Sequence, residues 1–299
     1  MRFGVLKFGT VSWELRVIQT HELDRAEGIR IETLELATNQ ATQVALQAGR
    51  VDAIVADWFW VSRQRAEGAD WTFFPFSAAL GAVVVPAGSH VRSLPDLAGQ
   101  RLGIAGSPLD KSWLMLRALA WQKHGLDLDK AVAKSFAAPP LIGEQLQAGR
   151  LDAVLTYWQF AARLEAGGMT RLIGMDEVMR DLGIARPIPL VGYVVSERWA
   201  KGQGKVVEGF VRASQRARQI LASSDAEWDA IASMTGAGSR DELIKIRDAF
   251  RAGIPQSWGD AERRDAVRLY RMLAEIGGEA LVGKSVDLQP GTFLDGVTY

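Results

Sequence analysis

The chain has 299 residues, enough for two domains of about 150 residues each, and 48 % are hydrophobic, so a full core is possible and intrinsic disorder is excluded. Lys plus Arg and Asp plus Glu both number 35, and this balance argues against a nucleic-acid-binding protein, which usually has a basic excess. Cysteine is absent, which excludes disulfides, thiol nucleophiles and cysteine-ligated metals, and no apolar run reaches the ~20 residues that span a bilayer.

The first third of the sequence alternates strand-like and helix-like segments. Short apolar or alternating runs predict strands at 2–8, 29–37 and 51–58, and helix-like stretches ending in glycine lie at 13–28 and 41–49. Thr38 or Asn39 can cap the second helix. This strand–helix–strand–helix–strand order is typical of a mostly parallel sheet with crossover helices.

The same order restarts after a connector at 93–100. Strands are predicted at 101–106, 151–158 and 189–199, one helix is predicted at 109–125, and the next helix is predicted to begin at 139–140. Pro139 and Pro140 suit the first turn of a helix, because proline lacks only an N–H that would be unpaired there. Long helical patterns then run to about Ile276, followed by the tail VDLQPGTFLDG.

One segment occurs twice in the chain. LQAGRVDAIVADW (46–58) and LQAGRLDAVLTYW (146–158) are offset by 100 residues and are identical at 8 of 13 positions. Ser12–Trp13 and Ser112–Trp113 match at the same offset. A solenoid needs periods of about 20–50 residues and three or more copies. The sequence therefore predicts an α/β fold with two similar lobes.

The repeat also predicts where a ligand binds. Ligands of open parallel sheets bind outside the carboxyl ends of the strands, where helix N-termini offer free N–H groups. The repeat ends there in Asp57–Trp58 and in Tyr157–Trp158. The difference between Asp57 in one copy and Tyr157 in the other is expected if the two copies line opposite walls of one asymmetric site. The alternatives are that Asp57 caps a helix, since a buried carboxylate needs a partner, and that the tryptophans cover the core.

These residues, together with SLPDLAGQRLGIAG (93–106) and PGTFL (290–294), give the chain a resemblance to a known family. The chain resembles the substrate-binding proteins of ABC importers, in the nitrate/sulfonate/taurine/thiamine-precursor branch of the type II periplasmic-binding-protein superfamily. The resemblance implies helices on both faces of each sheet and two crossover segments, near 85–89 and 188–192. Lobe 1 is then 1–86 and 190–299, including the C-terminal helices, and lobe 2 is 87–189, with the ligand cleft between them.

The resemblance also implies ligand-binding residues in both lobes. They are Thr10, Ser12, Trp13, Asn39, Asp57, Trp58 and Gly81 in lobe 1, Gly106, Ser107, Asp110, Lys111, Ser112, Trp113, Pro140, Tyr157 and Trp158 in lobe 2, and Tyr193 after the second crossing. The loop from Gly106 to Ser112 can receive an acidic group. Trp13 and Trp113 can sandwich a flat or cationic ligand. The alternatives are that Lys111 is a solvated surface residue and that both indoles pack under the loops.

The expected function is that of a solute-binding protein without cofactor, bound metal or catalytic residue. Acidic cleft candidates, among them Glu14 and Asp110, accompany Lys111, so the ligand is expected to be zwitterionic or a nitrogen heterocycle rather than a simple anion; a hard cation or its chelate is the alternative. The expected partners are the solute and the membrane subunits of an ABC importer, with no nucleic acid, and the protein is expected to be a monomer. The opening MRFGVLKFGT predicts a strand instead of a signal peptide, so the protein is either cytoplasmic or has lost a leader. The family resemblance favours the second interpretation, a periplasmic or lipid-anchored protein whose leader has been removed.

Two other functions compete. The first alternative is a cytoplasmic enzyme of thiamine-pyrimidine synthesis or of quinone biosynthesis, since enzymes of both kinds resemble this family in fold. The former carry a cysteine-rich motif that is absent here, and no nucleophile–base pair is recognisable. A ligand-sensing domain of a regulator would need a DNA-binding module, and no helix-turn-helix precedes Arg2.

Overall fold

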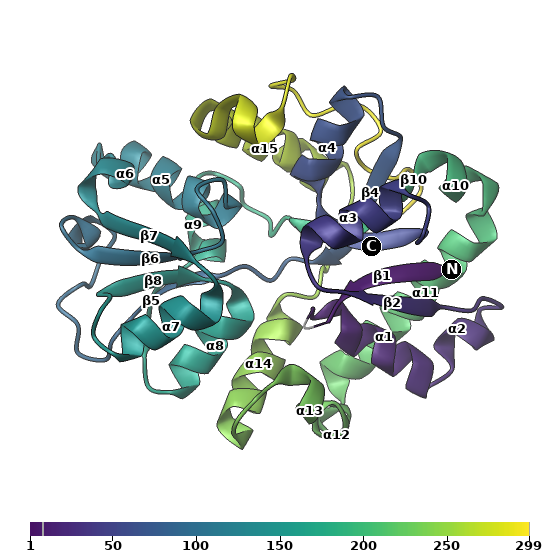
Figure 1. The fold of residues 1–299 in the computed structure, drawn as a ribbon, viewed down its shortest axis with the longest axis horizontal. Helices are drawn as coiled ribbons and strands as arrows, with labels where there is room; N and C mark the ends of the chain where they lie inside the picture. Colours follow the sequence, from purple (N-terminus) through teal and green to yellow (C-terminus); the bar gives the residue numbers. More distant parts are fainter. Residues whose placement is uncertain (8, 299) are drawn as a thin grey trace.

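The computed structural model describes residues 1–7 and 9–298 and contains two lobes, each built on a five-stranded sheet (Figure 1). The lobe 1 sheet has the order β2 (Glu32–Leu36), β1 (Arg2–Leu6), β3 (Ala53–Asp57), β10 (Val191–Ser196), β4 (Trp71–Ser77). The lobe 2 sheet has the order β7 (Ala133–Ala137), β6 (Arg101–Ala105), β8 (Ala153–Thr156), β5 (Ala82–Val85), β9 (Thr170–Gly174). The predicted strand at 2–8 ends at Leu6, and Phe8 lies outside the described residues.

The two sheets share one topology. In each, a single strand runs against the others: β10 is antiparallel to β3 and β4, and β5 is antiparallel to β8 and β9. The remaining neighbours are parallel, β1 with β2 and β3, and β6 with β7 and β8. The prediction of two similar, mostly parallel lobes is confirmed.

Helices cover both faces of each sheet, as expected (Figure 1). The first part of lobe 1 carries α1 (Val11–Thr20), α2 (Leu23–Ala26), α3 (Asn39–Gln47) and α4 (Trp58–Ala66). Lobe 2 carries a 3-10 turn (Pro95–Leu97), α5 (Lys111–His124), α6 (Leu128–Ala131), α7 (Pro139–Gln147), α8 (Trp158–Ala166) and α9 (Met175–Asp181). The C-terminal part holds α10 (Glu197–Gly202), α11 (Gly204–Ser223), α12 (Asp225–Ala230), α13 (Ala232–Thr235), α14 (Arg240–Ala252) and α15 (Asp260–Val282).

The first crossing between the lobes lies earlier than predicted. Residues 82–85 form β5, which pairs with β8 and β9 of lobe 2, so the chain leaves lobe 1 at 78–81. The predicted crossing at 85–89 and the boundary at residue 86 are therefore wrong. The chain returns between the end of α9 at Asp181 and the start of β10 at Val191.

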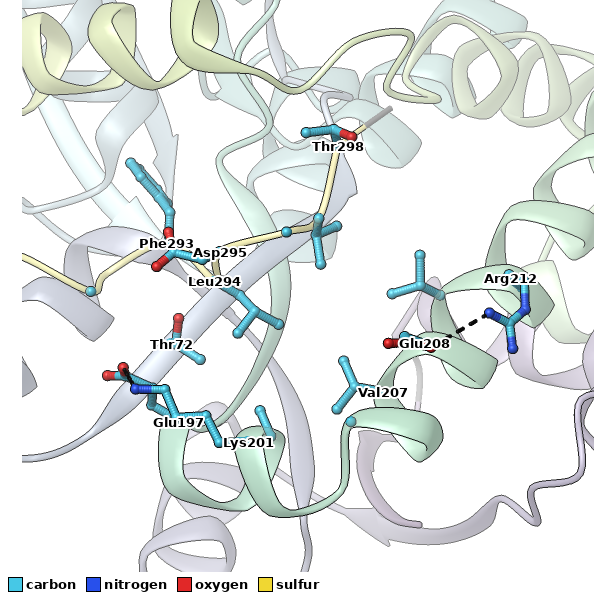
Figure 2. A pocket seen from close by; sticks show the side chains of 16 residues that line it. Thr72, Glu197, Lys201, Val207, Glu208, Arg212, Phe293, Leu294, Asp295 and Thr298 are labelled. Carbon is cyan, nitrogen blue, oxygen red and sulfur yellow. Dashed lines mark hydrogen bonds and ion pairs between the residues drawn. The ribbon is translucent and has the colours of Figure 1, made fainter.

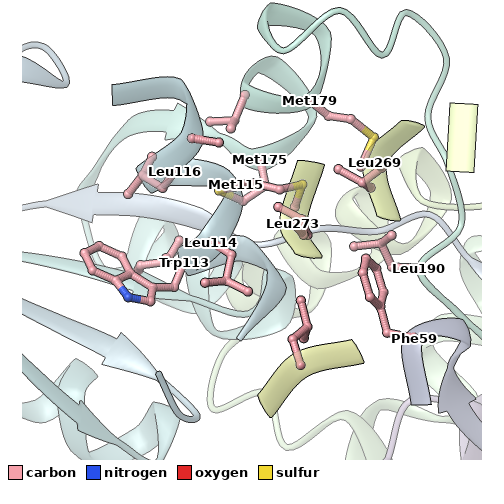
Figure 3. Packing of buried hydrophobic residues seen from close by; sticks show 14 of the residues in the cluster. Phe59, Trp113, Leu114, Met115, Leu116, Met175, Met179, Leu190, Leu269 and Leu273 are labelled. Carbon is pink, nitrogen blue, oxygen red and sulfur yellow. The ribbon is translucent and has the colours of Figure 1, made fainter. Parts of the chain in front are cut away.

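The resemblance implied that the C-terminal helices pack on lobe 1, but in the structure they contact both lobes. The helix α11 packs on α1 within lobe 1, but α14 packs on α8 of lobe 2, and α15 contacts both α4 and α5. Figure 3 shows Leu273 of α15 near Met115 and Met175 of lobe 2, and Leu269 of α15 near Met179, within one cluster of buried residues that spans both lobes. The apolar faces of α14 and α15 thus hold the two lobes together.

The aspartate of each repeated segment, Asp52 or Asp152, anchors the start of the central strand in its lobe. Asp52 accepts hydrogen bonds from the Arg2 backbone nitrogen (2.7 Å) and guanidinium (2.6 Å). Asp152 accepts the same bonds from Arg101, at 2.8 and 2.7 Å. Each aspartate stands just before β3 or β8, so it ties that strand to β1 or β6. The repeat therefore conserves a structural anchor at the edge of each sheet opposite the ligand-facing strand ends.

Asp152→Asn should lower the free energy of unfolding by about 1–2 kcal/mol at neutral pH. The hydrogen bond from Arg101 lowers the pKa of Asp152 from 3.8 to about 2. Because this pKa is depressed in the folded state, the stabilisation is complete above about pH 4 and is lost as the pH falls toward 2. Urea unfolding should therefore show a constant gap between wild type and variant from pH 7 to 5 that narrows below pH 4. A gap that does not narrow would contradict this role.

Candidate functional site

Two adjoining cavities lie where the carboxyl ends of the two sheets meet. Their volumes are about 430 and 920 Å³. They share six lining residues: Leu6, Asn39, Gln43 and Asp57 from lobe 1, and Pro139 and Tyr157 from lobe 2. The smaller cavity is mainly apolar, with Val5, Val11, Val55, Phe76 and Phe160 in its walls. The larger one has three charged side chains besides the shared Asp57, namely Arg63, Asp110 and Lys111. Both lobes contribute to each cavity, so we call the pair the interlobe cleft.

A further cavity of about 420 Å³ lies within lobe 1, between α10, α11 and the tail that ends the described chain (Figure 2). Its charged side chains pair with one another or with neighbours: Glu197 accepts from Lys201 (2.7 Å), and Arg212 donates to Glu27 (2.7 Å). The tail adds a short parallel bridge, Phe73 to Phe293, at the edge of the sheet. None of the predicted site residues lines this cavity. The interlobe cleft is the better candidate.

Asp57 joins the two lobes across the cleft. It ends β3, and its Oδ1 accepts from the Trp60 backbone N–H (3.0 Å), which caps α4. Its Oδ2 accepts from Lys111 Nζ of lobe 2 at 2.8 Å, and both side chains are about one-quarter exposed, at 25 and 26 %. One carboxylate therefore serves as a helix cap and as half of an interlobe ion pair.

Asp110 and Tyr157 form the opposite wall. Asp110 caps α5 by accepting from the backbone N–H groups of Ser112 (2.9 Å) and Trp113 (3.2 Å), and burial raises the pKa of its carboxyl. Burial also raises the pKa of the Tyr157 hydroxyl, so this group is a neutral donor and acceptor. Gly106, with φ +91°, lies so close that a Cβ would be 2.7 Å from that hydroxyl. The glycine thus makes room for Tyr157 at the cleft.

The structure brings eight of the predicted residues to the cleft: Thr10, Asn39, Asp57, Gly106, Ser107, Asp110, Lys111 and Tyr157. It places the other nine elsewhere: Ser12, Trp13, Trp58, Gly81, Ser112, Trp113, Pro140, Trp158 and Tyr193. Pro139, rather than Pro140, faces the cavities. The eight cleft residues remain proposed ligand contacts, whereas each of the others has a structural setting.

The predicted clamp of Trp13 and Trp113 is wrong. Trp113 is fully buried in lobe 2, and Trp13, which is 4 % exposed, donates its indole N–H to the Met234 carbonyl at 3.2 Å. Trp58 is also fully buried, and its indole N–H donates to the Pro189 carbonyl at 3.0 Å. All three residues do stand in the first turn of a helix, but the helical phase turns each indole under the loops and into the core.

Tyr193 and Trp158 are also corrected. The Tyr193 hydroxyl donates to Glu14, which is itself buried, so neither residue reaches the cleft. Trp158 crosses to lobe 1 and meets Trp13 edge to face, with ring centroids 5.9 Å apart, and lies 6.2 Å from the Phe250 ring. It therefore contributes to the contact between the lobes.

Four small or polar predicted residues have local roles instead. Gly81 lies at the first crossing, where a Cβ would stand 2.0 Å from the Thr156 carbonyl oxygen, so only glycine fits. Ser12 directs its hydroxyl to the Leu6 carbonyl at 3.5 Å. Ser112 donates its backbone N–H to the α5 cap, and Pro140 fills the first turn of α7. These positions shape the walls without lining the cavities.

Sequence reasoning missed several cleft residues. Gln43 lies one helical turn after Asn39 on α3, and Arg63 lies one turn after Phe59 and Trp60 on α4. Gln159, two residues after Tyr157, lines the smaller cavity, and its buried Oε1 has no hydrogen-bond partner among the described residues. Helical spacing from the predicted helix starts was the signal that would have found the first two.

Neither a metal centre nor a membrane span emerges from the described residues. Within 1–7 and 9–298, no three His, Cys, Asp or Glu side chains are grouped as metal ligands. In the same part of the chain, every helix is too short or too polar to cross a membrane.

Two lobes of one topology, joined by two crossings around a mixed polar and apolar cleft, define the architecture of a bilobal binding protein. The chain belongs to the NMT1/THI5-like family, whose sequence model matches residues 76–227. No curated protein sequence matches the chain.

Solved structures share this fold across almost the entire chain. The periplasmic aliphatic sulphonate binding protein SsuA from Escherichia coli is 19 % identical, with a TM-score of 0.75, over 96 % of this chain and 95 % of that one. The alkanesulfonate-binding protein SsuA from Xanthomonas axonopodis pv. citri, bound to MOPS, is 18 % identical, with a TM-score of 0.71, over 98 and 97 %. A zinc-bound ligand-binding component of an ABC-type import system from Staphylococcus aureus is 14 % identical, with a TM-score of 0.70, over 99 and 98 %. At these identities the likeness establishes the fold.

Proposed function

We propose that this protein captures a small polar solute in the interlobe cleft and presents it to the membrane subunits of an ABC importer. The observation that carries the proposal is the Asp57–Lys111 pair, because it brings the carboxyl end of a lobe 1 strand to a helix start of lobe 2 inside the cavities. A solute bound there contacts both lobes at once and therefore stabilises the closed arrangement.

The composition of the cleft supports a solute with both polar and apolar parts. Acidic and basic side chains line the larger cavity, and the smaller cavity has apolar walls. A zwitterion or a nitrogen heterocycle suits the charged lining of the larger cavity and the apolar walls of the smaller one. The fold relatives named above support the transport role, since they are described as sulphonate-binding proteins and import components, and the name of the Escherichia coli protein supports a periplasmic location.

A thermal-shift screen tests the proposal, with sulfonates, amines, amino acids, pyrimidines and divalent metals as candidate ligands. A true solute at 100 times its Kd should add about 2.7 kcal/mol of stability. Small-angle scattering should then give a smaller radius of gyration with the solute than without it. If no compound class binds, the proposal fails; if a solute binds at saturation without changing the radius of gyration, closure is refuted while binding stands.

A further inference from the structure

Four charged side chains line the cleft, and three of them already have partners. Lys111 and Asp57 form the interlobe ion pair at 2.8 Å. Asp110 accepts from two backbone N–H groups of its own helix. Arg63 forms no hydrogen bond or ion pair with any residue of the described chain, although it lines the larger cavity. Among the described residues, Arg63 of α4 is therefore the charged side chain of the cleft that has no hydrogen-bond or ion-pair partner.

The position of Arg63 is restrained by its surroundings. Arg63 is partly buried, one helical turn beyond Trp60, which is 7 % exposed and lines the same cavity. Its Cγ lies 2.8 Å from the place where a Cβ on Gly283 would stand, so the arginine stem lies beside the backbone that follows α15. The residue after the helix is a glycine with φ +70°, which leaves room for this contact. The stem thus has fewer free rotamers than that of a surface arginine.

We propose that Arg63 holds an acidic group of the solute, a sulfonate or a carboxylate, in the larger cavity. This inference rests on the proposed function and names the chemistry of one end of its ligand. The planar guanidinium matches the two oxygens of such a group, and a partly buried cation without a partner gains most from one. Lys111 is less suited to this role, because Asp57 already neutralises it.

The two cavities then orient the solute. With its acidic group at Arg63, the solute extends past the shared residues Asn39 and Gln43 and places its apolar part in the smaller cavity, beside Phe76 and Phe160. The cleft therefore selects acids that carry an apolar body. It disfavours the corresponding amides, which leave the guanidinium without a countercharge.

Matched pairs of acids and amides test this assignment: linear alkanesulfonates with their sulfonamides, and alkanoates with their carboxamides. Isothermal titration of the wild type should show binding by acids and much weaker binding by amides. Arg63→Gln should weaken acid binding about 10- to 100-fold, since a hydrogen bond to a charged group is lost, and should leave the weak amide binding unchanged. Arg63→Lys should give an intermediate loss of affinity for acids, because lysine retains the positive charge but lacks the paired N–H donors of the planar guanidinium.

Arg16→Gln is the matched control, because Arg16 is an exposed arginine of lobe 1 that does not line the cleft. It should bind as wild type does. If acids bind Arg63→Gln as tightly as wild type, or if wild type prefers the amides, the assignment is overturned. If Arg63→Gln does not fold, Arg63→Lys decides in its place: unchanged acid affinity overturns the assignment. If wild type binds nothing in these pairs or in the broad screen, the proposed function itself is overturned, and this inference with it.

Discussion

Replacing Arg218 with methionine should lower the free energy of unfolding by about 3–5 kcal/mol, the cost of leaving a buried charge without its partner. Arg218 is 4 % exposed and faces the fully buried Glu14 in the core of lobe 1, with 3.6 Å between Nε and Oε2. The Tyr193 hydroxyl donates to Oε1 of the same carboxylate and lies 3.1 Å from the Ser214 hydroxyl. Without the guanidinium, the partners left to Glu14 among the described residues are the hydroxyls of Tyr193 and Ser214.

The pH dependence of the Arg218→Met defect should identify its cause. Burial raises the pKa of Glu14 above 4.5, and Arg218 opposes that rise, so the variant should have a still higher pKa. A group with a raised folded pKa contributes stability below its unfolded pKa and loses it as the pH rises through the folded value. The defect should therefore be largest at neutral pH and shrink as the pH falls toward 4.5.

Urea unfolding at pH 7 and pH 5 measures this difference. The double variant Glu14→Gln, Arg218→Met is the control, because it removes both charges and should recover much of the loss. An equal defect at the two pH values would show that lost packing, and not an unpaired carboxylate, is responsible.

Asp57→Asn should weaken solute binding by about 1.5–3 kcal/mol and barely change the stability of the free protein. Asparagine caps a helix about as well as aspartate, so the bond to the Trp60 N–H survives, while the ion pair to Lys111 is lost. Asp57→Ala removes both interactions and should cost about 1 kcal/mol of stability in addition. The comparison separates the cap from the cleft contact.

Calorimetry with a solute found in the screen measures this effect, and Lys111→Met completes a double-mutant cycle. The two substitutions should be non-additive, because they break one pair. Wild-type affinity in Asp57→Asn would mean that the carboxylate serves the fold alone.

The sequence predicted the architecture well because the information is local and repeated. Glycine-terminated helices, apolar strands and the 100-residue repeat were sufficient for two similar lobes. The misplaced crossing has a clear cause: the run at 82–85 has the composition of a buried strand, but nothing in it says which sheet it joins. That choice depends on pairing with β8 and β9, which lie about 70 to 90 residues later in the chain.

The cleft was predicted less well, because the direction of a side chain depends on helical phase. Residues that end strands or cap helices, such as Asp57 and Asp110, have fixed directions and were placed at the cleft correctly by position. Trp58, one residue after Asp57, and Trp113, three residues after Asp110, instead point into the core. Arg63 lies deeper in a helix, and its position in the cleft depends on Gly283, a contact over 220 residues of chain that no local pattern encodes.

The insertion of β10 between β3 and β4 sets an order of assembly during biosynthesis. The lobe 1 sheet has its other four strands by residue 77 but lacks the strand that joins β3 to β4 until residue 196 has been made. The lobe 2 sheet is contiguous, from 82 to 174, and can form as a unit in the meantime. The later-made α14 and α15 then brace a lobe that was completed before them. The half that starts first is thus finished last, and its β3 and β4 edges lack their shared partner strand for more than 110 residues of synthesis, the period in which an unpaired edge can aggregate.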